Sequence, residues 1–320
     1  MPACPRLRPL DISPLDHDGQ RVFGLRDPSG SADGVLVIPE VGVVVLMLCD
    51  GARSAEEIVA ELKSRIGYVA TETEINDFLA RLDEGLFLDT PRFHAHEQAV
   101  LEAFRAAPVR AAANAGRTYP ADPTELRTAL DGYVGAPPPS GSEPLPSAIV
   151  APHIDFARGG SAYGVGYSRL MAAAERPDLV VVFGTDHNGS GAPFTLTRKA
   201  FDTPLGRVET EADLVDVLAR EAGERLFEEE LHHRGEHSIE FQAVWLRYVY
   251  GDHTPPILPV LCGSLQHCVA NRRSPRSDPE VARFLDTLAR LTSERRVLTI
   301  AGADLAHVGP RFGDEFEVTP

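Results

Sequence analysis

The sequence predicts an α/β protein with a mainly parallel sheet flanked by helices, preceded by a small α+β domain of winged-helix type. From residue 147 onward, short β-branched apolar runs alternate with longer stretches whose apolar residues recur at helical spacing. Such alternation is typical of a parallel sheet that is covered on both faces. Three of the runs end close to a histidine, at His153, His187 and His307. Open α/β sheets form their sites beyond the carboxyl ends of strands, so we expect these histidines to converge.

The composition indicates an acidic globular protein with neither a nucleic-acid nor a membrane partner. The 320 residues suffice for two domains, and 43% hydrophobic with 24% charged residues is an ordinary balance. A net charge of -16 and a pI near 5.1 lack the basic surface that phosphate backbones and anionic membranes require. The sequence shows neither a signal peptide nor an apolar run of about 18 residues. We therefore expect a cytoplasmic protein.

Residues 1–91 are predicted to form a separate small module. Its pattern combines short strands with two helices that start at recognisable capping residues. The expected elements are strands over 21–25 and 34–38, a turn at Asp50-Gly51, a helix that begins with the capping box Ser54 to Glu57, and a helix over 72–84 that is followed by a strand-like return over 85–88. This order is typical of a winged-helix fold.

Residues 92–146 are predicted to lead into the α/β domain, which is expected over 147–320. The lead-in contains helices over 93–106 and 124–133, and then a loop over 136–146 that is rich in proline. The α/β domain is expected to contain strands over 147–151, 179–183, 194–198, 256–261 and 296–301 and helices over 162–174, 210–222, 238–250 and 278–292.

A fourth histidine, His237, precedes a stretch with helical spacing and is expected at a helix start beside the same crevice. Four imidazoles with several carboxylates in one cleft suggest a metal site. The remaining histidines lie in polar stretches and are expected to be solvated. They are His232, His233, His253 and His267, together with His17, His94 and His96 near the N-terminus.

Six short phrases, in a fixed order along the chain, carry a family resemblance. They are Ala115-Gly116-Arg117-Thr118-Tyr119-Pro120, Ala151-Pro152-His153, Gly184-Thr185-Asp186-His187, Glu236-His237-Ser238-Ile239-Glu240-Phe241-Gln242, Leu258-Pro259-Val260-Leu261 and Asp304-Leu305-Ala306-His307. Over about residues 109–316 the chain resembles the Memo family, the B component of the AmmeMemoRadiSam gene set. That family is similar in fold to class III extradiol dioxygenases.

The resemblance implies one mononuclear site for Fe(II) or copper, with His153 and His187 as ligands. Imidazole also suits zinc. The resemblance to the dioxygenases implies that His237 acts as a general acid or base, oriented by Glu240 or Glu236. These assignments make His237 and Glu240 the expected catalytic pair.

The third ligand is where the sequence departs from the family. The cysteine of animal members aligns with Ala306, which cannot coordinate a metal, whereas the related dioxygenases use a carboxylate there. Asp304 and His307 flank the position and are the preferred substitutes, with Asp186 and Glu240 also available. Thr185 and Asp304 can alternatively hold the imidazoles through hydrogen bonds. Family members continue well past this phrase, so the resemblance implies a domain that is truncated at its C-terminus or unusually short.

The N-terminal module also carries a resemblance. Leu48-Cys49-Asp50-Gly51-Ala52-Arg53-Ser54-Ala55-Glu56-Glu57-Ile58, followed by Leu82-Asp83-Glu84-Gly85-Leu86, resembles PqqD-like modules. Such modules bind a peptide by adding it as a strand to a sheet edge. The alternative is a structural domain that packs on the rest of the chain.

Three functions from different classes follow. The first is a metal-dependent oxidoreductase that acts on a small or peptide-linked substrate. The second is a non-catalytic accessory protein that presents a peptide or a metal to a radical-SAM partner. The third is a zinc hydrolase, since three nitrogen or oxygen ligands and an open position also serve hydrolysis.

Overall fold

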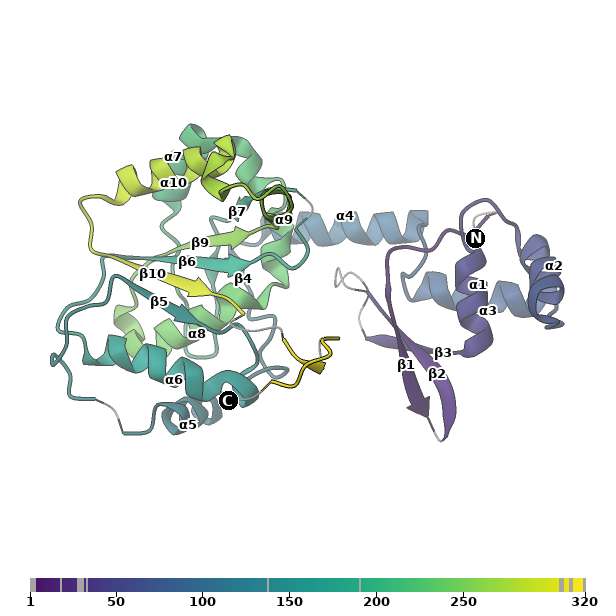
Figure 1. The fold of residues 1–320 in the computed structure, drawn as a ribbon, viewed down its shortest axis with the longest axis horizontal. Helices are drawn as coiled ribbons and strands as arrows, with labels where there is room; N and C mark the ends of the chain where they lie inside the picture. Colours follow the sequence, from purple (N-terminus) through teal and green to yellow (C-terminus); the bar gives the residue numbers. More distant parts are fainter. Residues whose placement is uncertain are drawn as a thin grey trace. The chain divides into compact units, whose positions relative to one another are not determined.

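The computed structural model divides the chain into two compact units, Met1–Ala106 and Ala107–Pro320 (Figure 1). It describes residues 4–17, 19–27, 32, 34–136, 138–189, 191–304, 308–310 and 313–318. The sequence placed boundaries near residues 91 and 146. In the structure the helix after Thr90 belongs to the first unit, and the segment from Ala107 onward belongs to the second.

The first unit combines a three-stranded antiparallel sheet, in the order β1-β2-β3, with four helices (Figure 1). Its elements are β1 (Asp11–His17), β2 (Gln20–Arg26), β3 (Val35–Pro39), α1 (Glu40–Leu48), α2 (Ala55–Ile66), α3 (Glu72–Glu84) and α4 (Pro91–Ala106). Capping boxes at Ser54 and Thr71 start α2 and α3, because each side chain accepts the N–H of the glutamate three residues on and that glutamate accepts the N–H of the cap. Both helices were predicted, and both are confirmed.

Helix α1 is the one described helix of this unit that the sequence did not predict, and strand β1 was not predicted either. The residues of α1 are almost all apolar, so no polar face marks a helical period. In the structure Val45, Leu46 and Leu48 are buried in the core of the unit, whereas Met47 is exposed. The helix therefore contributes a buried face that hydrophobic patterning alone does not distinguish from a strand.

The second unit contains a five-stranded sheet with helices on both faces, as predicted. Its strands are β4 (Val109–Arg110), β5 (Ala148–Ala151), β6 (Leu179–Thr185), β7 (Phe194–Leu196), β8 (Ala200–Phe201), β9 (Ile257–Cys262) and β10 (Val297–Gly302). Its helices are α5 (Pro123–Val134), α6 (Phe156–Ala172), α7 (Ala212–Ala222), η1 (Glu224–Phe227), η2 (Glu230–Arg234), α8 (His237–Tyr250), η3 (Gly251–His253), α9 (Gln266–Ala270), η4 (Pro275–Ser277) and α10 (Pro279–Thr292).

The strand order in this sheet is β5-β10-β6-β9-β7, with all neighbours parallel except β7 and β9. The last strand in sequence, β10, thus lies between β5 and β6. Short strands β4 and β8 pair separately. The mainly parallel sheet confirms the predicted fold class.

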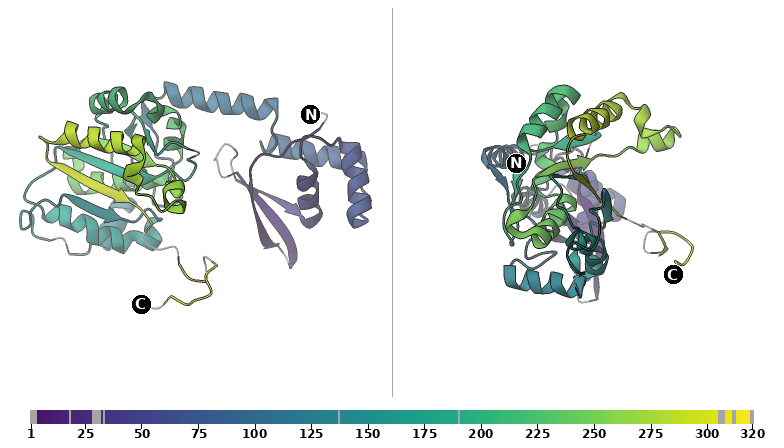
Figure 2. Two further views of the ribbon diagram at one scale, coloured as in Figure 1. Left: turned by 45° about the horizontal axis from the view of Figure 1, so that its top comes forward. Right: turned by 90° about the vertical axis from the view of Figure 1, so that its left-hand side faces the viewer.

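Two hydrophobic cores cover the two faces of the sheet. Helices α5, α6 and α8 lie on one face, and α7 and α10 lie on the other (Figures 1 and 2). Alternate residues of β6 point to opposite faces, so Val180 and Val182 pack in the first core and Leu179 and Val181 in the second. A strand that is buried on both faces reads as a continuous apolar run, which is the pattern the sequence shows.

The chain's single tryptophan, Trp245, anchors the first core. Its ring stacks on Tyr163 and Tyr167 of α6, with centroid distances of 5.6 and 5.2 Å. Helix α6 approaches α5 closely at Gly164, where an added Cβ would lie 2.2 Å from the carbonyl oxygen of Tyr133. This contact fixes the helix layer that lies under β5.

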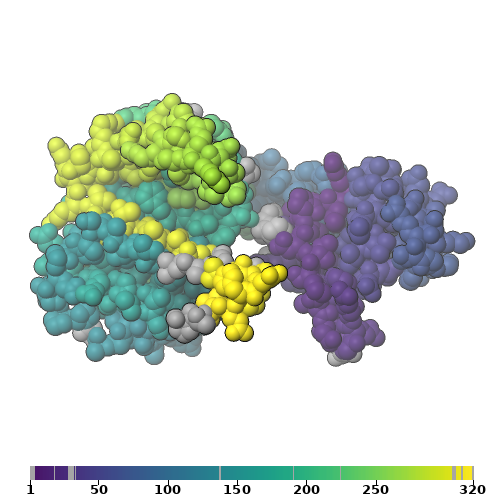
Figure 3. Space-filling model, in the orientation of Figure 1, coloured from purple at the N-terminus to yellow at the C-terminus, as the bar shows by residue number. Residues whose placement is uncertain are grey.

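The described segment that follows β10 lies at the surface, where Figure 3 shows it in yellow. Residues 315–318 are all exposed. Within the described part of the chain, no helix combines the length and the apolar character needed to cross a membrane.

Replacing Leu170 by alanine is expected to destabilise the second unit by about 2–5 kcal/mol, because the side chain is 2% exposed in the first core and its removal leaves a cavity. Urea unfolding followed by Trp245 fluorescence measures the effect on this unit. Val165→Ala is the matched control on the same helix. Its side chain is 70% exposed, so it should change stability by less than about 0.5 kcal/mol. Equal losses in the two variants would contradict this assignment of the core.

Candidate metal centre

The strand order places three side chains at one edge of the sheet. His153 follows β5, Asp304 follows β10 and His187 follows β6, and these three strands are adjacent and parallel. The ring centroids of His153 and His187 lie 5.0 Å apart. His307, which the sequence also assigned to this edge, and Ala306 lie outside the described residues.

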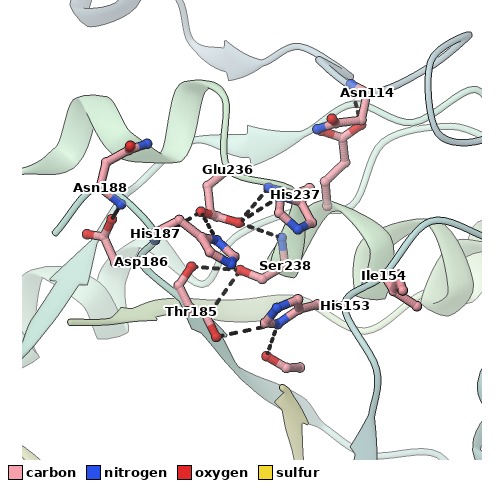
Figure 4. Close-up of polar contacts among 12 residues, drawn as sticks. Asn114, His153, Ile154, Thr185, Asp186, His187, Asn188, Glu236, His237 and Ser238 are labelled. Carbon is pink, nitrogen blue, oxygen red and sulfur yellow. Dashed lines mark hydrogen bonds and ion pairs between the residues drawn. The ribbon is translucent and has the colours of Figure 1, made fainter. Parts of the chain in front are cut away.

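His237 reaches the same place from helix α8, of which it is the first residue (Figure 4). Ser238 ties the start of this helix to the end of β6, since its Oγ accepts the N–H of Thr185 at 3.0 Å and donates to the Thr185 carbonyl at 3.1 Å. Gly184 permits this approach, because an added Cβ would lie 2.5 Å from Ser238 Oγ. The close contact explains why the run before His187 ends in glycine.

The three imidazoles form one compact group. The His237 ring centroid lies 4.9 Å from that of His187 and 5.4 Å from that of His153. One nitrogen from each ring falls within 4.8 Å of the other two. The structure therefore brings together the three histidines that the sequence selected most strongly.

Hydrogen bonds determine which nitrogen of each ring remains available. His153 Nδ1 lies 3.1 Å from the Gly302 carbonyl oxygen, and His187 Nδ1 lies 2.8 Å from Glu236 Oε2. His237 Nδ1 lies 3.2 Å from Glu236 Oε1. Carbonyl and carboxylate oxygens only accept, so Nδ1 of His153 and of His187 carries the proton and donates. The Nε2 lone pairs of these two rings are left for a metal or a proton. The contact of His237 with Glu236 is electrostatic.

Glu236 hydrogen-bonds the ring of His187, lies beside the ring of His237 and also starts the helix. Its Oε1 accepts the backbone N–H groups of His237 and Ser238 at 2.8 and 2.9 Å, as an N-cap does. Burial would raise the pKa of this carboxyl, but the hydrogen bond and charge of His187, with His237 and the Ser238 N–H, lower it to about 2. Glu236 is therefore ionised at neutral pH.

The pKa values of His187 and His237 shift in opposite directions. The hydrogen bond to Glu236 raises the pKa of His187, whereas burial lowers the pKa of His237. His237 is consequently neutral at pH 7, with one ring nitrogen able to accept a proton.

Asp304 adds a carboxylate to the group. Its Oδ1 lies 3.0 Å from His153 Nε2, the nitrogen that the Gly302 contact leaves available. A carboxylate and an imidazole lone pair at this distance share a cation, either a proton or a metal ion. Two imidazoles and one carboxylate thus come from three neighbouring strand ends.

Glu240 serves a different purpose from the one the sequence suggested. It is fully buried and accepts hydrogen bonds from Arg110, Tyr119 and Asn114, the last through its backbone N–H at 3.0 Å and its amide at 2.9 Å. Arg110 also donates to the Glu236 carbonyl at 2.7 Å. Glu236, and not Glu240, makes the contact with His237. Glu240 holds the segment around Tyr119 against α8, because its four acceptor positions are used there.

Two other histidines are less exposed to solvent than the sequence predicted. His233 is 1% exposed, and its Nε2 donates to the Thr195 carbonyl at 3.1 Å. Burial lowers its pKa to about 3. His232 is partly buried, and its Nδ1 lies 2.9 Å from Asp186 Oδ2. The prediction that both are solvated was wrong, since η2, which carries both, places His233 against Thr195 of β7 and His232 beside Asp186. His253 and His267 are exposed, as expected.

The fold and this group of imidazoles define an α/β protein with a histidine-rich site at the carboxyl edge of its sheet. Residues 110–319 match the family model described as Memo-like protein. The chain belongs to this family. It is 28% identical over 317 residues to a MEMO1 family protein of Aquifex aeolicus, which covers 99% of this chain and 79% of that one.

Further relatives match a smaller share of the chain. A MEMO1 family protein of Methanopyrus kandleri is 34% identical over 211 residues, covering 63% of this chain and 70% of its own. One of Thermus thermophilus is 27% identical over 263 residues, with 82% and 74% covered. The resemblance that the sequence motifs carried is thereby confirmed at the level of the family.

Glu240→Ala is expected to cost the second unit about 3–5 kcal/mol, because it leaves the Arg110 guanidinium buried without its carboxylate. The measurement is urea unfolding followed by Trp245 fluorescence. Glu221→Ala is the control, since the Glu221–Arg290 pair is exposed and should contribute less than about 1 kcal/mol. A Glu240→Ala variant as stable as the control would show that the buried network does not brace the site.

Proposed function

We propose that this chain binds one redox-active metal ion at His153, His187 and Asp304, with Fe(II) as the preferred ion and copper as the alternative. The observation that carries the proposal is the hydrogen bonding of the rings, which leaves Nε2 of His153 and His187 available beside the Asp304 carboxylate. Two histidines and one carboxylate are the donor set of non-haem Fe(II) oxygenases. Residue 306, where the family's animal members carry a thiolate, is alanine, so the remaining donors favour iron over Cu(I).

The residues present fit such an ion chemically. Each ligating ring has its other nitrogen bonded to an oxygen, which sets the tautomer and raises the basicity of Nε2. When bound, the metal would act as a Lewis acid and electron-transfer centre for a coordinated substrate.

His237 supplies the proton chemistry in this proposal. It is neutral at pH 7, the Glu236 carboxylate lies 3.2 Å from its Nδ1, and one of its ring nitrogens lies within 4.8 Å of a nitrogen of each of the other two imidazoles. A substrate hydroxyl placed there would lose its proton to a nitrogen of this ring, and Glu236 would stabilise the imidazolium that forms. The proposed reaction class is a metal-dependent oxidation of a small or peptide-linked hydroxyl compound, with dioxygen as the oxidant.

Anaerobic loading of the full chain with Fe(II) should yield one equivalent at this centre. His153→Ala and His187→Ala should each lose that equivalent, because each removes an imidazole ligand. The measurement is iron per chain after gel filtration. His253→Ala is the control, since His253 is exposed on the one-turn helix η3 and does not belong to the histidine group. Iron retained by both ligand variants would refute the assignment.

Glu236→Gln tests how the rings are positioned. The amide nitrogen of glutamine cannot accept a hydrogen bond and its oxygen carries no charge, so His187 loses its charged acceptor. We therefore expect Fe(II) affinity to fall about 10- to 100-fold. Three imidazoles within 4.8 Å also suit zinc. If the chain retains Zn(II) and no Fe(II) or copper, oxidation is excluded and a zinc hydrolase becomes the better proposal.

A second role rests on the first unit. We propose that β3 accepts a peptide as an added strand, which would make the chain an accessory partner of a radical-SAM protein or its peptide. The sheet has two edges. Pro14, which lacks an N–H and discourages pairing, lies in the middle of β1, whereas the proline of β3, Pro39, is its last residue. Strand β3 has no described partner on its outer side, and its Val35 and Val37 are 55% and 46% exposed. This edge suits strand addition.

Val35→Lys combined with Val37→Lys should reduce capture of such a partner at least tenfold, because charges on an edge strand oppose pairing. Capture from a lysate of the source cells, with mass spectrometry of what is bound, measures this. Val69→Lys is the control, since Val69 is 77% exposed in the same unit, outside the sheet. If the wild-type chain captures neither a radical-SAM protein nor a peptide, the accessory role is wrong.

A further inference from the structure

A second group of metal-binding side chains lies beside the histidine centre. Asp186, Glu229 and His232 each offer one ligand atom, and these atoms lie within 4.8 Å of one another. Asp186 follows β6, while Glu229 and His232 come from the segment of one-turn helices η1 and η2. None of the three side chains takes part in the histidine group.

These side chains are largely withdrawn from solvent. The side chain of Asp186 is 1% exposed and that of His232 is 24% exposed, and Glu229 Oε2 is buried. Two carboxylates this close repel each other strongly where water is excluded. A divalent cation bound between them would offset this repulsion.

The group is directed away from the first centre. Figure 4 shows the Asp186 carboxylate beside Asn188 and pointing away from the three imidazole rings. Its Oδ1 accepts the N–H of Asn188 at 3.1 Å, and its Oδ2 lies 2.9 Å from His232 Nδ1. The neighbouring residue, His187, is held by Glu236 in the other group. A cation at each group would therefore use separate donors.

We propose that Asp186, Glu229 and His232 bind a second divalent cation, of the zinc or manganese type. Two carboxylate oxygens and one imidazole nitrogen suit Zn(II) and Mn(II), and such a set disfavours Cu(I), which prefers sulfur. The cation would crosslink η2 to the end of β6. Because η2 is followed by Glu236 and His237, this crosslink would steady the approach to the first centre.

Metal analysis of the full chain tests the proposal. After loading with Zn(II) or Mn(II) and gel filtration, His232→Ala and Glu229→Gln should each contain one equivalent less than the wild-type chain. Glu229→Gln keeps the shape of the side chain, so a folding failure of His232→Ala would not decide the matter. Glu228→Gln is the matched control, because Glu228 precedes Glu229 and pairs with Arg225 at the surface. It should keep the full metal content.

His153→Ala distinguishes this site from the first one. It should remove a different equivalent, and the melting temperature of His153→Ala should still rise on adding Zn(II), whereas that of Glu229→Gln should rise less. Metal content and stabilisation unchanged in both Glu229→Gln and His232→Ala would overturn the second site. A loss in Glu229→Gln without one in His153→Ala would support it and refute the first centre instead.

Discussion

The carboxylate of Glu236 is the contact on which the site depends. It caps α8, accepts the Nδ1–H of His187, and lies 3.2 Å from the Nδ1 of His237. Helix start and ring orientation are therefore set by one side chain. Because the capped N–H groups and His187 both favour the ionised carboxyl, the charge that the helix end prefers is also the charge that orients the rings.

The support behind this carboxylate is a buried ion pair that does not touch the imidazoles. Arg110 donates to Glu240 and to the backbone carbonyls of Glu236 and His233. Tyr119 and Asn114 complete the environment of Glu240, which explains the Ala115–Pro120 phrase as a structural motif. A buried pair of this kind gives little net stability but strongly penalises the loss of either partner. The pair supports the site because Arg110 fixes the backbone conformation of the residues before α8.

Much of the fold follows from the sequence because local patterns were consistent. Capping boxes at Ser54 and Thr71 marked helix starts, and continuous apolar runs marked the buried strands. Helix α1 escaped prediction because it lacks a polar face. The strand order also escaped, since the position of β10 between β5 and β6 arises from long-range pairing, which no local pattern encodes.

Part of the candidate site could also be predicted from the sequence. His153, His187 and His237 were identified because their places at strand and helix ends are local features. Glu240 was misassigned because its partners lie more than a hundred residues away in Arg110 and Tyr119. The burial of His233 likewise depends on β7, which polar neighbours in the sequence do not reveal.

The central position of β10 has a consequence for how the protein is made. In the described part of the chain β5 pairs with β10 alone, and Ala148 has Thr299 as its partner. During synthesis β5 leaves the ribosome well before β10. It cannot pair until almost the whole domain has been made. Pairing across such a separation forms slowly. Until then an apolar strand is left without its neighbour and is open to wrong association. The domain should accordingly depend on chaperones during synthesis more than its size suggests, and the histidine edge should assemble last.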